Sequence, residues 1–232
     1  MNITLVGYGK MGRAIEAAAQ EAGDEIVYWM DIDENPLEAG FSGDWISRTD
    51  VLMDFSTADI VPMNVANAVR CGIPIVVGTT GWYDQLDTVR DTVVQGGGAC
   101  VWAGNFSLGV QIFFQLTRRA GEMFSRFEEY HPYLVETHHV QKLDAPSGTA
   151  FTMESILGEC YGRPVNAVSV RAGFFPGIHV AGFDSAVDTI RLEHQARSRG
   201  GFARGALFAG RWIQGKQGFY AFEDAVFGEQ ND

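Results

Sequence analysis

The sequence predicts an α/β protein in which a doubly wound parallel sheet is followed by a second, mixed α+β domain. Apolar strand patterns alternate with helical patterns up to about residue 107, which is typical of a sheet with helices on both faces. Beyond that point a long apolar helix leads to strands of alternating polarity. We therefore expect a first domain at residues 1–106, completed by residues 206–232, and a second domain at residues 107–205.

The chain opens with a strand, helix, strand unit. A short apolar strand enters the glycine-rich stretch GYGKMG, and apolar residues at helical spacing continue to Gly23, a helix stop. A second apolar run, residues 26–30, ends at Asp31. The alternation then continues with strand patterns in residues 50–56, 73–81 and 99–107, helical patterns in residues 58–72 and 84–98, and a loop-like linker in residues 33–50.

The second domain begins with an apolar helical pattern at residues 108–124. Strand patterns follow at residues 133–139, 167–173 and 188–197, and the helical pattern that starts after Ser147 lies between the first two of these. Such a mixture predicts strands with helices on one side rather than a continuation of the parallel sheet.

Composition excludes several classes of partner. Of the 232 residues, 46% are hydrophobic, which is ample for a packed core. The net charge of −12 is spread along the chain, which argues against nucleic acid and against an anionic membrane surface. No stretch approaches the roughly 20 apolar residues of a membrane span. The three cysteines lie far apart and form no C-x-x-C pair, which fits a protein of the reducing cytoplasm.

The stretch GYGKMG has the spacing G-x-G-x-x-G at Gly7, Gly9 and Gly12. Between a strand and a helix, these glycines allow a tight turn, a bare backbone against a pyrophosphate, and close packing of helix on strand. Asp31 ends the second strand, where a carboxylate accepts hydrogen bonds from the adenosine ribose. A Rossmann-like dinucleotide site is therefore predicted, and a plain glycine turn with a solvated aspartate is the alternative.

Asp31 also bears on the choice of cofactor. A carboxylate at this position repels a 2′-phosphate, and Ile32 follows where a site that prefers NADPH often has arginine. NADH is therefore the expected cofactor, with NADPH as the alternative. Two further loops, residues 78–81 and 103–107, leave the carboxyl ends of predicted strands, which is where open sheets bind ligands.

The segment ETHHVQKLDAPSGTA, residues 136–150, raises the question of a metal site. His138 and His139 should face opposite sides of their strand, and Glu136 with His138 supplies only two ligands. We therefore expect no metal. A satisfied strand histidine remains the plain alternative for either imidazole.

The second half of this segment indicates an anion site instead. Ser147 precedes a helical pattern and is the expected N-cap, so the N–H groups of Gly148 and Thr149 would face an anion. With Lys142 and one histidine they would form a pocket for a carboxylate, while the other histidine moves a proton near neutral pH. Taken singly, the lysine could be a solvated loop residue and the serine a mere cap.

The pattern E-x-H-H-x-x-K-x-D-A-P-S-G-T-A resembles the substrate segment of the dihydrodipicolinate reductase family, the 4-hydroxy-tetrahydrodipicolinate reductases. The resemblance continues in family order through GYGKMG, VLMDFS, VVGTTGW, GNFSLGV, RAGFFPGIHVAGF, EHQARSRGGFARGALFAGRWI and KQGFYAFED. It implies a Rossmann-like domain with a mixed domain that builds a homotetramer.

The resemblance also implies roles for individual residues. His138 would be the proton donor and acceptor, Lys142 the second catalytic residue, and His139, Gly148 and Thr149 the ligands of the substrate carboxylates. The residues implied to hold the dinucleotide are Gly7, Tyr8, Gly9, Lys10, Met11, Gly12, Asp31, Gly78, Thr79, Thr80, Ala103, Gly104, Asn105 and Phe106.

The implied reaction is the NAD(P)H-dependent reduction of (2S,4S)-4-hydroxy-2,3,4,5-tetrahydrodipicolinate, a small dicarboxylate, to 2,3,4,5-tetrahydrodipicolinate and water. It belongs to diaminopimelate and lysine biosynthesis. Two rival interpretations stay open. One is another nicotinamide enzyme, such as an amino-acid or imine reductase, which the double-histidine segment disfavours. The other is a dinucleotide sensor without catalysis, which has no need of a proton donor.

Overall fold

The computed structural model describes residues 1–31 and 40–228 and divides the chain into two compact units. Unit 1 comprises Met1–Ser107 and Arg199–Asp232, and unit 2 comprises Leu108–Ser198. The second boundary therefore falls before Arg199, whereas the sequence pattern placed it after residue 205. The physical reason is that residues 200–212 form one continuous helix, α6, which packs against α1 of unit 1.

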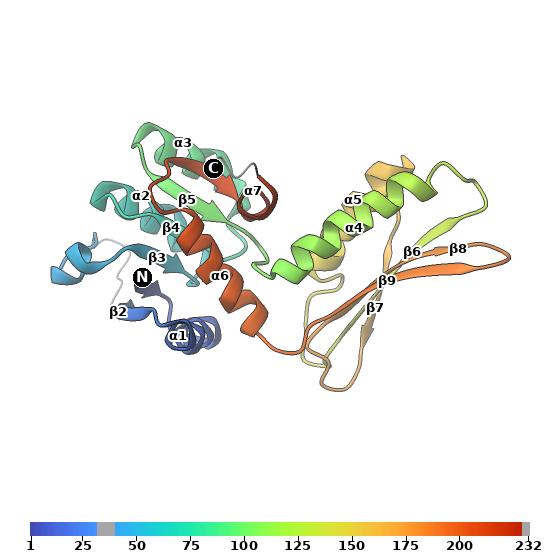
Figure 1. The fold of residues 1–232 in the computed structure, drawn as a ribbon, viewed down its shortest axis with the longest axis horizontal. Coiled ribbons are helices and arrows are strands. Elements are labelled where there is room, and N and C mark those ends of the chain that lie inside the picture. The colour runs from blue at the N-terminus through green and yellow to red at the C-terminus, as the bar shows by residue number, and fades with distance from the viewer. Residues whose placement is uncertain (32–39, 229–232) are drawn as a thin grey trace. The chain divides into compact units, whose positions relative to one another are not determined.

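Unit 1 is built on a six-stranded parallel sheet in the order β10-β5-β4-β3-β1-β2. The strands are β1 (Asn2–Val6), β2 (Glu25–Met30), β3 (Val51–Asp54), β4 (Ile75–Val77), β5 (Ala99–Trp102) and β10 (Gly218–Ala221). The helices are α1 (Lys10–Ala22), α2 (Val61–Cys71), α3 (Leu86–Gln95), α6 (Gly200–Trp212) and α7 (Phe222–Phe227). Helices lie on both faces of this sheet (Figure 1), which confirms the predicted doubly wound fold.

The strand order reverses beside β1, because β2 pairs with one of its edges and β3 with the other. The central strands β3 and β4 are fully buried along their whole length, as the continuous apolar runs in the sequence predict. A reversal of strand order of this kind leaves a crevice at the carboxyl ends of the strands, which is where open α/β sheets bind their ligands.

Short 3₁₀ helices modify three of the predicted segments. The turns η2 (Ala58–Ile60) and η3 (Tyr83–Gln85) precede α2 and α3, and α2 has Pro62 in its first turn, where a missing N–H costs nothing. Within the predicted linker, η1 (Asp44–Arg48) buries Trp45, whose ring stacks on Tyr28 at 5.2 Å between centroids. The rest of that linker up to residue 39, with Ile32, lies outside the described residues.

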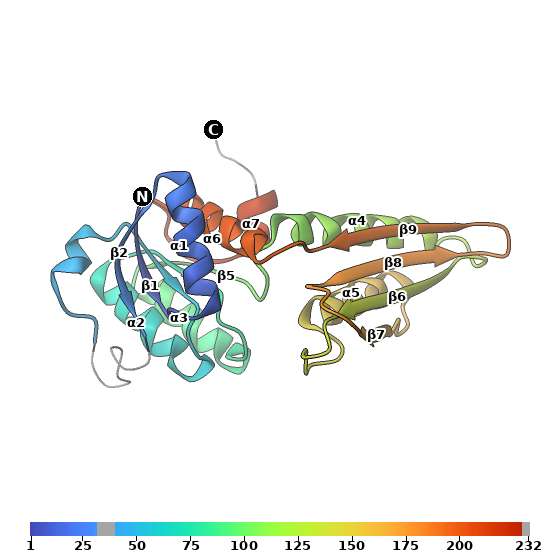
Figure 2. The same ribbon diagram turned by 90° about the horizontal axis from the view of Figure 1, so that it is seen from below.

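Unit 2 is a four-stranded mixed sheet in the order β7-β6-β8-β9. The elements are α4 (Leu108–Phe124), β6 (His131–His138), α5 (Gly148–Tyr161), β7 (Ala167–Arg171), β8 (Ile178–Asp184) and β9 (Thr189–Gln195). Only β6 and β7 run parallel, while β6 with β8 and β8 with β9 are antiparallel. The two helices pack on each other and on this sheet (Figure 2), so the predicted mixed fold is confirmed.

Candidate active site

The three glycines of the first turn, Gly7, Gly9 and Gly12, differ in what a side chain at each position would contact. Gly7 has φ +90°, and a Cβ atom there would lie 2.4 Å from the carbonyl oxygen of Phe55. A Cβ at Gly12 would lie 2.5 Å from the carbonyl oxygen of Gly7, so α1 can pack closely on β1 only with glycine there. At Gly9, by contrast, a Cβ would meet nothing within 4 Å. The Gly9 backbone therefore faces open space at the start of α1.

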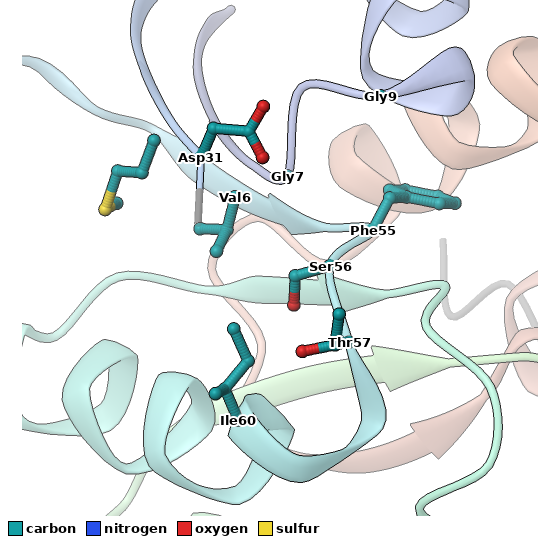
Figure 3. Close-up of a pocket in the computed structure, with 9 residues that line it drawn as sticks. Val6, Gly7, Gly9, Asp31, Phe55, Ser56, Thr57 and Ile60 are labelled. Carbon is teal, nitrogen blue, oxygen red and sulfur yellow. The ribbon is translucent and has the colours of Figure 1, made fainter. Parts of the chain in front are cut away.

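A pocket of about 270 Å³ opens beside this turn, at the place where the strand order reverses. Its walls come from the carboxyl ends of β1, β2 and β3, and it is lined by Val6, Gly7, Gly9, Met30, Asp31, Phe55, Ser56, Thr57 and Ile60. Figure 3 shows Gly7 between Asp31 on one side and Ser56 and Thr57 on the other. A bare glycine backbone opposite a carboxylate suits the pyrophosphate and ribose of a dinucleotide.

Sequence reasoning missed one wall of this pocket. Ser56 and Thr57 follow β3, whereas the sequence prediction named only the loops after the next two strands, β4 and β5. The same rule, applied to every predicted strand, would have found them.

Asp54, the last residue of β3, links the loop after β3 to the loop after β4 through hydrogen bonds. It is fully buried, and its carboxylate accepts hydrogen bonds from the Ser56 amide (3.0 Å) and hydroxyl (2.6 Å), from Thr79 Oγ1 (2.8 Å) and from Asn64 Nδ2 (2.8 Å). Burial raises the pKa of Asp54, and the hydrogen bonds from Ser56, Asn64 and Thr79 oppose this rise. The carboxylate thus joins the loop after β3 to the loop after β4.

Replacing this carboxylate tests its role. Asp54→Asn places an amide N–H₂ among donors, so we expect a loss of about 1–3 kcal/mol in the free energy of unfolding and weaker NAD(P)H binding. Urea unfolding and dinucleotide titration measure the two effects. The matched control is Asp59→Asn, which changes an exposed aspartate in the neighbouring turn. Equal behaviour of both variants would show that Asp54 does not hold the pocket wall.

The other residues expected at the dinucleotide have different places in unit 1. Tyr8 stacks on Trp29 at 4.8 Å and donates a hydrogen bond to Glu16, and Lys10 is exposed. Neither these two nor Met11 and Gly12 line the pocket as the structure describes it. Tyr8 belongs to the turn itself, and Lys10, Met11 and Gly12 are the first residues of α1.

The loops after β4 and β5 lie at the same edge of the sheet but do not line this pocket. In the first, a Cβ at Gly78 would lie 2.0 Å from the Phe55 ring, the Thr79 hydroxyl is bonded to Asp54, and Thr80 is exposed. The Thr79 side chain therefore makes a structural hydrogen bond at the carboxyl edge of the sheet.

In the loop after β5, Ala103 is buried, and a Cβ at Gly104 would lie 2.9 Å from the Tyr83 hydroxyl. Asn105 accepts a hydrogen bond from the Ser107 amide, at 2.9 Å. Phe106 packs between the rings of Phe55 and Phe222, so its side chain belongs to the core.

The second cluster of predicted site residues lies in unit 2, at the end of β6. His138 is the last residue of this strand and is only 6% exposed. Its Nδ1 atom lies 2.6 Å from Oε2 of Glu136, which occupies the same face of the strand. A Cβ atom at Gly177 would lie 3.0 Å from Nε2, so this glycine keeps side-chain atoms away from the second ring nitrogen.

Burial and neighbouring groups shift the pKa values of both Glu136 and His138. Burial alone would raise the pKa of Glu136, but hydrogen bonds from Ser169, Arg171 and Ser147 outweigh it and lower the pKa to about 2. For His138, burial lowers the pKa, the Glu136 carboxylate opposes that effect, and Lys142 and Arg171 add to it. Glu136 therefore carries its charge throughout the physiological range.

His179 of β8 completes the cluster, because register pairs it with Glu136. Its Nε2 atom lies 3.2 Å from the Ser147 hydroxyl, and its ring meets that of His138 edge to face at 5.2 Å. Burial, together with the charge of His138, lowers the pKa of His179 to about 4. Sequence reasoning counted two candidate metal ligands here, whereas Glu136, His138 and His179 bring three ligand atoms within 4.8 Å of one another.

The helix start after Ser147 is formed as its residue types predict. Ser147 is the N-cap of α5, and its hydroxyl accepts a hydrogen bond from the Ala150 amide at 3.2 Å. Gly148 and Thr149 are the first two residues of the helix, whose N-terminal N–H groups favour negative charge. They begin α5 directly after the buried Ser147, which hydrogen-bonds to both Glu136 and His179.

Lys142 and His139 lie in the loop between β6 and α5. The Lys142 ammonium is 2.8 Å from Asp144, and burial leaves 25% of the lysine side chain exposed. His139 falls outside the strand, with its amide donating to the Phe175 carbonyl at 2.9 Å, so the expected alternation of faces ends at His138. The His139 Nδ1 atom is buried and has no hydrogen-bond partner among residues 1–31 and 40–228.

A pocket beside a glycine turn on a doubly wound sheet, and an imidazole, carboxylate and lysine cluster on a second unit, fit the class of NAD(P)H-dependent oxidoreductases that act on a small substrate. The family model described as "Dihydrodipicolinate reductase, N-terminus" matches residues 1–106, and that described as "Dihydrodipicolinate reductase, C-terminus" matches residues 109–226. The chain belongs to the dihydrodipicolinate reductase family.

Relatives agree with this assignment. The 4-hydroxy-tetrahydrodipicolinate reductase of Christiangramia forsetii is 35% identical over 97% of this chain and 98% of its own length. That of Methanoregula boonei is 37% identical over 77% of this chain and 75% of its own length. Among solved structures, the dipicolinate-bound dihydrodipicolinate reductase of Paenisporosarcina sp. TG-14 has a TM-score of 0.76 at 21% identity, covering 97% of this chain and 98% of that one.

No helix in the part of the chain that the structure describes is long and apolar enough to cross a bilayer.

Proposed function

We propose that the protein reduces 4-hydroxy-tetrahydrodipicolinate to tetrahydrodipicolinate and water, with NAD(P)H as reductant, in the route to diaminopimelate and lysine. The single observation that carries this proposal is the buried Glu136 and His138 pair beside the start of α5, in a chain of the dihydrodipicolinate reductase family. Relatives with the corresponding name, matched over nearly the whole chain, support it.

His138 is the proton donor in this proposal. Its Nδ1 atom faces Glu136, so Nε2 is the ring nitrogen that can deliver a proton to a substrate carbon. Gly177 supports this assignment, because any side chain there would press on Nε2. After the substrate has lost water and accepted a hydride, the protonation by His138 completes the addition of two hydrogens across the double bond.

Lys142, His139, Gly148 and Thr149 hold the two carboxylates. Lys142 now pairs with Asp144, and a substrate carboxylate can take the place of that exposed partner. The first turn of α5 offers backbone N–H groups to the other carboxylate. Arg171 is less suited, because its guanidinium is already bonded to Glu136 at 2.7 Å and to the Asp144 carbonyl at 2.5 Å.

The dinucleotide occupies the pocket beside Gly7, Gly9 and Asp31, with the remaining turn and loop residues named above around it. When bound, its nicotinamide supplies the hydride. Asp31 supports a preference for NADH over NADPH, because a carboxylate in the ribose wall repels a 2′-phosphate.

A homotetramer is supported by the uncovered face of the sheet in unit 2. Glu136 and Leu134 point to the face that the helices cover, so Val135, Val168 and Val180, which are paired across three strands, share the other face. Val168 is 61% exposed there. An aliphatic sheet face of this kind is covered in a symmetric oligomer.

A coupled assay tests the proposal. Aspartate semialdehyde, pyruvate and the synthase that condenses them generate the substrate, and oxidation of NADH or NADPH is followed at 340 nm. We expect turnover with both cofactors and a lower KM for NADH, because Asp31 penalises the phosphate. Absence of turnover with both, despite measured NADH binding, would favour a dinucleotide sensor. A lower KM for NADPH would overturn the preference alone.

A further inference from the structure

Glu136 is a buried carboxylate of unit 2 that lies beside the proposed proton donor and accepts several hydrogen bonds. Its side chain is 1% exposed in the middle of the sheet. Oε1 accepts hydrogen bonds from the Ser169 hydroxyl at 2.6 Å, from Arg171 at 2.7 Å and from the Ser147 amide at 3.2 Å. Burying a charge this deeply is costly unless every lone pair is used.

The second oxygen of Glu136 is reserved for one contact. Oε2 lies at an ion-pair distance of 2.6 Å from Nδ1 of His138, and among the described residues neither buried atom makes a hydrogen bond in the present orientation of the imidazole ring. This separation matches a charge-assisted hydrogen bond. The three donors on Oε1 fix the plane of the carboxylate, so Oε2 can reach His138 only in this direction.

The same residues do not suit a metal. Glu136, His138 and His179 have three ligand atoms close together, but a cation would compete with the Arg171 guanidinium already on Glu136. The contact of 2.6 Å between Oε2 and Nδ1 is also that of a shared proton, and Ser147 already bonds to His179. The cluster is therefore organised around protons.

We propose that Glu136 is the positioning residue for His138: its Oε2 receives the Nδ1 proton and thereby presents Nε2 to the substrate, while Arg171 and Ser169 hold the carboxylate in place. The inference rests on the proposed function, since it assigns a partner to the proton donor named there. A histidine whose tautomer is set by a carboxylate on its far nitrogen is a recurrent arrangement in acid–base catalysis.

The charged and titratable groups around His138 define what a change at Glu136 would do. His138 faces Glu136 on its own strand, Arg171 on β7, His179 on β8 with His194 of β9 beyond it, and Lys142 in the following loop. Glu136 is the only one of these that favours the charged imidazole. Removing its charge should therefore shift the falling limb of the pH profile to lower pH.

The test compares Glu136→Gln with Glu154→Gln in otherwise intact protein. Glu154 is a matched control, because its half-buried carboxylate also accepts a structural hydrogen bond, from the Ala167 amide at 2.7 Å, but it has no contact with His138. Three experiments are made: kinetics, which give kcat and KM over a pH series, binding of dipicolinate, and NMR, in which the ¹⁵N shifts of His138 report its tautomer.

For Glu136→Gln we expect kcat to fall by about 10- to 100-fold, by analogy with the removal of a carboxylate that orients a metal-binding histidine. Dipicolinate should still bind, the falling limb should move to lower pH, and the ¹⁵N shifts should show a mixture of tautomers. Glu154→Gln should leave the tautomer and the pH profile unchanged. Arg171→Lys keeps the positive charge but loses the planar guanidinium with its several N–H donors. It should give a smaller fall in kcat than Glu136→Gln.

Wild-type kcat and an unchanged tautomer in Glu136→Gln would overturn the inference, and so would an equal loss in Glu154→Gln. If Glu136→Gln fails to fold, Arg171→Lys decides, because a wild-type kcat with an unchanged His138 tautomer there contradicts the proposed chain of contacts. An inactive wild-type protein would instead contradict the proposed function. The two failures are thus distinguishable.

Discussion

Replacing His138 by glutamine is expected to lower turnover by about 100- to 10,000-fold, the usual contribution of a positioned proton donor. Glutamine is close to histidine in size and can still hydrogen-bond to Glu136, but it has no proton to give near neutral pH. Because His138 ends β6 with its ring packed against His179, the substitution should leave the sheet intact. The coupled assay measures kcat, and circular dichroism verifies the fold.

His131→Gln provides the control for this substitution. His131 is the first residue of the same strand and is exposed, so its loss should leave kcat unchanged. Turnover of His138→Gln close to that of the wild type would exclude His138 as the proton donor.

The pH profile gives His138 a second signature. A donor must be protonated, so activity should fall as pH rises through its pKa, and burial lowers the pKa of His138 below the ordinary value of an imidazole. The limb of kcat/KM, which reports the free enzyme, should therefore lie below that of kcat, because a bound dicarboxylate favours the imidazolium. His138→Gln should abolish both limbs.

Lys142→Ala is expected to damage both substrate binding and turnover. A charge-assisted hydrogen bond to a carboxylate contributes about 1.5–3 kcal/mol, which corresponds to a rise of roughly 10- to 100-fold in KM. A fall in kcat should accompany it, because a dicarboxylate held at one end only is poorly aligned with His138. Initial rates over a range of substrate concentrations separate the two effects.

The comparison variant is Lys216→Ala, which removes a lysine of unit 1 that lies over the Trp212 ring. Its kinetic constants should match those of the wild type. A normal KM in Lys142→Ala would remove Lys142 from the carboxylate site, whatever happened to kcat.

The alternation of strands and helices predicted the fold because local periodicity and turn residues decide these elements. The spacing of Gly7 and Asp31 likewise predicted one pocket, since both residues end adjacent parallel strands. The cap at Ser147 is equally local, and the structure confirms it.

Contacts between strands distant in sequence were beyond such reasoning. His179 stands beside Glu136 only because β8 pairs with β6 in a particular register, and no pattern near either residue encodes that register. The same is true of Asp54, whose contact with Thr79 depends on two neighbouring parallel strands. Charged residues buried by tertiary pairing look, in a sequence, like ordinary polar residues of a strand.

The placement of α6 and β10 in unit 1 has a consequence for synthesis of the chain. Unit 2 is one continuous segment that ends at Ser198, whereas unit 1 needs residues from both sides of it. β10 forms the edge beyond β5, and α6 covers β3 and β4, so both must be made before the parallel sheet is complete. On the ribosome, unit 2 can therefore finish folding before unit 1. Until β10 has been made, the parallel sheet of unit 1 has an unpaired edge at β5, which chaperones can bind.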